Sequence, residues 1–218
     1  MDDELESIVC PHKHDTIFRA DSQDVLANAC LNYSDSTDVL YAEGYKRAAR
    51  LLTKQVLETY SDQDFLVFPI VYLYRHHLEL AIKRLTRIGC FIADWELTET
   101  EIRHLEKHRL DLLWNNFKPI MKTVCQLTGW EMPDEDIKGV DSYIRQLADA
   151  DPASQGFRYP CSKKGERSVP QLRHINIRVF AEAMEWIADF FEGVDAGFVH
   201  LADAKSEILS HWRSEMAF

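Results

Sequence analysis

Apolar residues recur at three- and four-residue steps through most of the chain from residue 37 onward, and no run of any length alternates apolar with polar residues. The clearest example lies between residues 63 and 88, where the recurring positions are Ile70, Leu73, His77, Leu80, Ala81, Ile82, Leu85 and Ile88. This spacing is typical of one face of an α-helix, whereas a half-buried strand repeats every two residues. We therefore expect an all-α fold. It should be a single-domain helical bundle of five to six helices over residues 37–218, preceded by a polar N-terminal arm over residues 1–36.

Glycines and capping residues suggest where these helices end. Long helices are expected over residues 38–60, 63–88, 108–128 and 171–192, with shorter ones opening at Pro133 and spanning roughly 198–212. Gly89, Gly129 and Gly193 are predicted to stop the helices that precede them, because glycine readily adopts the left-handed conformation of a helix end.

Three other local patterns shape the expected bundle. Pro119 should kink or split the helix over 108–128, because proline removes a backbone donor. Thr98 and Glu101 have the spacing of a capping box, which predicts a short helical turn inside the connector over 90–107. The proline- and glycine-rich stretch over 151–170 should be a loop or a small hairpin.

Composition narrows the class of protein. The 218 residues carry a formal net charge of −11, which argues against a protein that coats nucleic acid over its whole surface. The five scattered cysteines form no CxxC pair, as is typical of reduced thiols in the cytoplasm. Cys10, His12 and His14 alternate but lack a second ligand pair with zinc spacing, so no metal site is expected. The acidic start does not resemble a signal peptide, and the longest apolar run, 65–74, is about half a membrane span. We expect a cytoplasmic protein without membrane contact or cofactor.

Positive charge is nevertheless concentrated in one stretch. Between Phe157 and Phe180 lie six basic residues against the single acid Glu166: Arg158, Lys163, Lys164, Arg167, Arg173 and Arg178. Such a local excess on an acidic protein is where an anionic ligand would bind, and Phe157 and Tyr159 offer rings on which bases can stack. The alternative is that these cations balance nearby carboxylates and face water. The expected substrate-binding residues of this stretch are Arg158, Lys163, Lys164, Arg173 and His174.

A second polar pattern lies within the apolar helix expected over residues 63–88. Arg75, Glu79 and Lys83 are spaced by four residues and share one face. They form either an ion-pair ladder or a functional group, in which Arg75 enters a cavity and Glu79 orients it. Under the second interpretation Arg75 and Glu79 are expected to bind substrate.

The sharpest chemical motif is the run from Arg103 to His108. Arginine holds a phosphate with a planar fork of donors, and histidine exchanges protons near neutral pH. On an unbroken helix two residues five apart differ by about 140° in direction, so they would not converge. The motif requires a helix to begin between Arg103 and His108, or a second subunit to complete it. Arg109 adds a further cation for substrate.

This Arg-polar-x-x-x-His string, in a helical domain of this size, resembles the HEPN superfamily. The resemblance implies metal-independent RNA cleavage at a site shared by two subunits, in a prokaryotic toxin or antiviral defence system. Arg103 would hold the scissile phosphate and His108 would transfer protons. The implied partners are RNA, a second copy of the chain, and an antitoxin or defence-system protein.

Three other segments look like a bacterial family to which we attach no activity. They are FPIVYLYRHHLEL from Phe68, HRLDLLW from His108 and FRYP from Phe157. The alternative to a nuclease is a non-catalytic helical module that binds a nucleotide, a nucleic acid or a protein partner.

Overall fold

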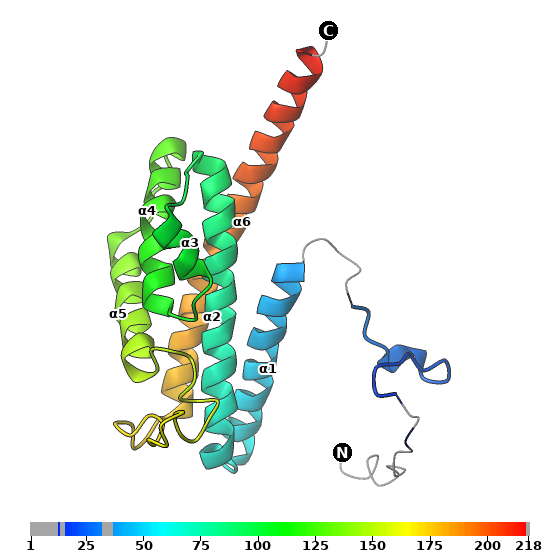
Figure 1. Cartoon of the computed structure of the whole chain (residues 1–218), viewed down its shortest axis with the longest axis vertical. Coiled ribbons are helices and arrows are strands. Elements are labelled where there is room, and N and C mark those ends of the chain that lie inside the picture. Colours follow the sequence, from blue (N-terminus) through cyan, green and yellow to red (C-terminus); the bar gives the residue numbers. More distant parts are fainter. Residues whose placement is uncertain (1–12, 14–15, 32–36, 217–218) are drawn as a thin grey trace. The chain divides into compact units, whose positions relative to one another are not determined.

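The computed structural model describes residue 13 and residues 16–31 and 37–216 (Figure 1). The chain separates into two units, Met1–Asp35 and Ser36–Phe218. The described part of the first unit contains one short 3₁₀ helix, η2 (Val25–Ala27). Paired hydrogen bonds between Asp21 and Asn28, both 2.8 Å, close the loop around it.

The second unit is all-α, as expected. Its helices are α1 (Thr37–Thr59), α2 (Gln63–Ala93), α3 (Glu99–Leu105), α4 (Leu110–Thr128), α5 (Asp134–Ala150) and α6 (Ile177–Glu215). Within the described residues there is no strand, only an isolated antiparallel bridge between Cys161 and Arg167 in the loop that follows α5. That bridge agrees with the expected loop or small hairpin. None of the helices in the described residues is long and apolar enough to cross a membrane.

Helix α2 is the centre of the bundle. It contacts α1, α4 and α6, and Figure 1 shows it running between α1 and α4. Ile70, Leu78 and Ile82 on its inner face are fully buried, whereas Phe65, Phe68 and Phe91 are exposed. Arg75, His77 and Glu79 are buried beside this core, so these polar residues of α2 are held on a rigid support.

Two of the three predicted glycine stops are wrong. Helix α2 continues past Gly89 to Ala93, and a Cβ atom at Gly89 would lie 2.8 Å from Ile120 and 2.9 Å from Phe198. Glycine is required there because α4 and α6 approach the α2 backbone closely. Gly193 lies in open space inside α6, which is one continuous helix. The separate helices predicted over 171–192 and 198–212 are therefore wrong.

The beginning of α6 also differs from expectation. It starts at Ile177, because the Asn176 side chain caps it by accepting a hydrogen bond from the Val179 N–H at 3.1 Å. Helix α4 runs through Pro119 without a break, so the predicted split does not occur.

Other predicted helix boundaries are confirmed. Gly129 ends α4 in the left-handed conformation, at φ = 69°. Thr98 and Glu101 form the reciprocal capping box at the start of α3, in which the Thr98 N–H donates to the Glu101 carboxylate at 2.7 Å. This capping box fixes the residue at which α3 begins. It therefore also fixes the position of the last turn of α3, from which the chain continues to His108.

Candidate functional site

A break between two helices brings His108 back onto α2. Helix α3 ends at Leu105 and α4 begins at Leu110, so His108 lies in the intervening turn, whereas Arg103 belongs to the last turn of α3. The condition that a helix begin between Arg103 and His108 is not met, because α3 ends between them and α4 begins only at Leu110. The turn carries the His108 imidazole to the middle of the polar face of α2.

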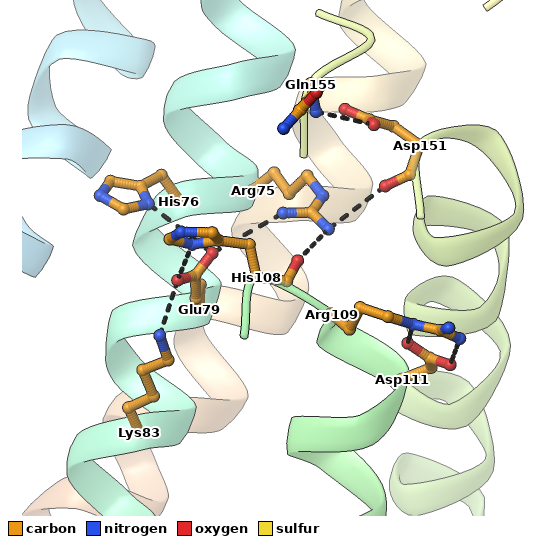
Figure 2. A network of polar contacts seen from close by, with 9 residues as sticks. All are labelled: Arg75, His76, Glu79, Lys83, His108, Arg109, Asp111, Asp151 and Gln155. Atoms are coloured by element: carbon orange, nitrogen blue, oxygen red, sulfur yellow. Dashed lines mark hydrogen bonds and ion pairs between the residues drawn. The ribbon is translucent and has the colours of Figure 1, made fainter. Parts of the chain in front are cut away.

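Glu79 is the centre of a cluster of five residues, which we call the Glu79 cluster: Arg75, His76, Glu79, Lys83 and His108 (Figure 2). Its side chain is 1% exposed. One carboxylate oxygen, Oε1, lies 2.8 Å from His108 Nδ1 and 2.8 Å from Lys83 Nζ. The other, Oε2, lies 3.8 Å from His76 Nδ1 and 3.8 Å from Arg75 Nη1. Four potentially cationic groups therefore surround one buried carboxylate.

The cluster keeps Glu79 ionised. Burial by itself would raise the pKa of this carboxyl, but the contacts with His76, Lys83 and His108 outweigh burial and lower the pKa to about 2. A carboxylate beside Nδ1 favours the form of neutral imidazole that carries its proton on Nδ1. In that form Nε2 of His108 is free to accept a proton. The His108 side chain is 55% exposed, so it is accessible to a ligand.

Arg75 acts on the backbone. Its side chain is 1% exposed, and Nη2 donates to the carbonyl oxygens of His108, at 2.7 Å, and Asp151, at 3.2 Å. Burial lowers the pKa of the guanidinium, yet arginine remains protonated in proteins. The sequence predicted a substrate-binding role, but the guanidinium does not reach the surface in this structure. It joins the turn before α4 and the loop after α5 to α2.

His76 is the member of the cluster that the sequence analysis missed. Its ring stacks on Tyr72, with centroids 5.6 Å apart, and meets the edge of Tyr45 at 4.4 Å. The Arg158 guanidinium lies 5.3 Å from the centres of both the Tyr72 and Tyr159 rings. The available signal was the three-residue spacing of His76 and Glu79, which places both on one helix face.

The structure gathers the remaining predicted residues only in part. Arg103 is exposed and donates to Thr100 Oγ1 at 3.2 Å, and within the described residues no hydrogen bond or ion pair joins it to His108. Arg109 pairs with Asp111. Lys163 and Lys164 are exposed in the loop closed by the Cys161–Arg167 bridge.

Three of the predicted basic residues meet in a pocket. Arg158, Arg173 and His174 line a pocket of about 960 Å³, together with Arg167 and the Phe68 ring. We expected Arg75, Glu79, Arg103 and His108 to approach one another in a cleft, with Arg158 or Arg173 near its rim. The structure brings Arg75, Glu79 and His108 together, and no hydrogen bond or ion pair among the described residues joins Arg103 to them.

In the part of the chain that the structure describes, no group of three or more His, Cys, Asp or Glu side chains is arranged to hold a metal ion. The alternating Cys10, His12 and His14 lie outside the described residues. No family model matches the chain, and no curated protein or solved structure gave a significant match.

Proposed function

We propose that this protein is a metal-independent endoribonuclease of HEPN type, acting in a prokaryotic toxin or antiviral defence system. The observation that carries the proposal is the His108–Glu79 pair, in which a half-exposed imidazole donates from Nδ1 to a buried carboxylate at 2.8 Å. A carboxylate that holds one ring nitrogen orients the ring and prepares the other nitrogen to exchange a proton. The assignment to RNA and to the HEPN type rests on the Arg103–His108 string.

In the proposed reaction Nε2 of His108 removes the proton from a ribose 2′-hydroxyl. The 2′-oxygen then attacks the adjacent phosphorus, and the 5′-oxygen of the next nucleotide leaves. The product carries a 2′,3′-cyclic phosphate. Glu79 stabilises the imidazolium that forms, because the carboxylate is already ionised and buried beside it.

Charge in and around the cluster is consistent with an anionic substrate. Within the Glu79 cluster the cations Arg75 and Lys83 outnumber the single carboxylate of Glu79, and protonation of a histidine adds to this positive charge. The exposed cations Arg103 and Arg158 are then available to the phosphate oxygens. A positive charge that appears as the reaction proceeds stabilises the transition state more than the ground state.

The test is cleavage of single-stranded RNA by purified protein in the presence of a chelator. Wild-type protein should yield cyclic-phosphate ends, and His108→Ala should cut about 10²–10⁴-fold more slowly with unchanged helix content. Light scattering of the same sample tests whether the chain forms the homodimer that the HEPN resemblance implies. Activity that survives His108→Ala and disappears with chelator contradicts this mechanism.

The second candidate is a non-catalytic module that binds a nucleotide or another phosphate-bearing ligand. The pocket of about 960 Å³ favours it, because Arg158, Arg167 and Arg173 lie around aromatic rings there. Binding of RNA that is lost in Arg173→Ala, with no cleavage by wild-type protein on any sequence, would establish this function instead.

A further inference from the structure

We propose that His76 is the second proton-transfer group of the site, so that a single buried carboxylate serves two histidines. The inference rests on the proposed ribonuclease function and deepens it. Transfer of the phosphoryl group from the 5′-oxygen to the 2′-oxygen needs a base that deprotonates the 2′-hydroxyl and an acid that protonates the departing 5′-oxygen. During one cleavage step His108 acts either as the base or as the acid. If it is the base, a second group must donate a proton to the departing 5′-oxygen.

The contacts of Glu79 support a pair of histidines. The two carboxylate oxygens face different rings, with Oε1 at 2.8 Å from Nδ1 of His108 and Oε2 at 3.8 Å from Nδ1 of His76 (Figure 2). Oε2 is buried and has no hydrogen-bond partner within the described residues. Arg75 Nη1 and His76 Nδ1 both lie 3.8 Å from Oε2, so a proton on His76 adds a second cation beside this oxygen. Both rings therefore present Nδ1 to the carboxylate and keep Nε2 for chemistry.

The surroundings of His76 suggest which step it performs. The row from His76 through Tyr72 to Arg158 and Tyr159 consists of rings and a guanidinium in successive contact. Tyr159, at the exposed end of this row, offers a ring on which a base can stack without sequence preference. A nucleotide held on this row is the one whose 5′-oxygen leaves, because that oxygen would then lie beside His76. His76 is accordingly the acid and His108 the base.

The step balances in protons and bonds. The 2′-hydroxyl proton passes to Nε2 of His108 as the bond between O2′ and phosphorus forms. The bond between phosphorus and O5′ breaks, and the proton on Nε2 of His76 passes to O5′. Hydrolysis of the cyclic product by water, in the reverse sense, restores both histidines.

The alternative is that His76 only packs between Tyr45 and Tyr72 and supports the helix face. Two variants separate packing from proton transfer. His76→Phe keeps an aromatic ring in the stack but has no ring nitrogen. His76→Gln keeps a donor for Glu79 but does not titrate. Packing alone predicts that His76→Phe stays active, whereas proton transfer predicts that both variants are impaired.

The decisive experiment compares two substrates that share one nucleoside: a dinucleotide and the corresponding nucleoside 3′-(4-nitrophenyl phosphate). The nitrophenolate leaves without a proton. Both His76 variants should lose about 10²–10⁴-fold on the dinucleotide and recover most of that loss on the aryl ester. His108→Gln should stay impaired on both substrates. His200→Gln, an exposed histidine on α6, should match wild type on both.

Each other outcome has a definite meaning. A His76→Phe enzyme as fast as wild type on the dinucleotide overturns the inference and leaves the proposed function intact. Equal impairment of both His76 variants on the two substrates also overturns it, since that marks a positioning role. Aryl-ester rescue of His108→Gln instead reverses the two roles and refutes the assignment. Wild-type protein that cleaves neither substrate, for any of the four nucleosides, defeats the proposed function and this inference together.

Discussion

Replacing Glu79 by glutamine should destabilise the protein strongly at neutral pH. Glutamine has the shape of a protonated glutamic acid, so the substitution removes the charge and little else. Relative to its ordinary value of 4.5, the pKa of Glu79 is lowered to about 2. At about 1.4 kcal/mol for each unit of pKa, the ionised form is favoured in the folded state by about 3 kcal/mol. We expect Glu79→Gln to lose this amount of unfolding free energy at pH 7.

The pH dependence makes the prediction specific. A carboxyl whose pKa is lowered on folding stabilises the protein above its unfolded pKa, and the stabilisation is lost as pH falls through the folded value. The difference between wild type and Glu79→Gln should therefore be complete above about pH 4.5 and should close as the pH approaches about 2.

Urea unfolding followed by far-ultraviolet circular dichroism, at a series of pH values, measures this difference. In a chain of this size about 3 kcal/mol corresponds to a fall in Tm of about 6–12 °C. Glu58→Gln is the matched control, because Glu58 is an exposed partner of Lys54 at 3.7 Å and should contribute at most about 0.5 kcal/mol. A Glu79→Gln protein within 1 kcal/mol of wild type at pH 7, with a gap independent of pH, would refute the electrostatic account of the cluster.

Four further substitutions test other parts of the structure. Arg75→Lys should cost at least about 2 kcal/mol in urea unfolding, because the shorter lysine side chain ends before the Nη2 position that serves both buried carbonyls, and bonds to charged groups contribute about 1.5–3 kcal/mol; an unchanged midpoint would contradict the assigned contacts. Gly89→Ala should destabilise by about 1–3 kcal/mol through overpacking in the same assay, and a neutral result would mean that the helices separate freely. Gly193→Ala should stabilise by about 0.5–1 kcal/mol, because its Cβ meets open space inside a helix, and a fall in Tm would be inconsistent with that environment. Thr98→Ala should weaken α3 by about 1 kcal/mol, seen as faster amide exchange confined to that helix; unchanged exchange there would argue against the capping box.

Local chemistry explains which helix ends could be predicted from the sequence. The end of α4 at Gly129 and the start of α3 at Thr98 depend on residues within a few positions of the boundary, so their patterns were sufficient. Gly89 and Gly193 resemble Gly129 in their sequence context, but neither of them ends a helix. Gly89 admits Phe198, which is more than a hundred residues away, and Gly193 has no close neighbour at all. When a glycine is needed because a distant side chain packs against its backbone, the residues that flank it in sequence do not reveal that role.

The site shows the same division. Arg75 and Glu79 share a helix face, so their proximity followed from their spacing. His108 meets Glu79 because the chain leaves α3 at Leu105 and enters α4 only at Leu110, and no residue pattern near His108 predicts that contact with α2. His76 was overlooked because the adjacent His77 fits the apolar pattern. In the structure His77 is buried and bonded to the Ala42 carbonyl, whereas His76 faces the cluster.

The way Arg75 holds the turn before α4 has a consequence for how such a protein can diverge. Its guanidinium binds the main-chain carbonyl at position 108 and does not bind the imidazole. Lys83 makes its own contact with Glu79, at 2.8 Å from Oε1. The location of the turn and the chemistry that it displays are thus encoded by different residues. Under the proposed mechanism, a substitution at position 108 would remove the proton-transfer group while Arg75 still holds the backbone of the turn. A scaffold of this kind would allow catalysis to be lost without a change of topology.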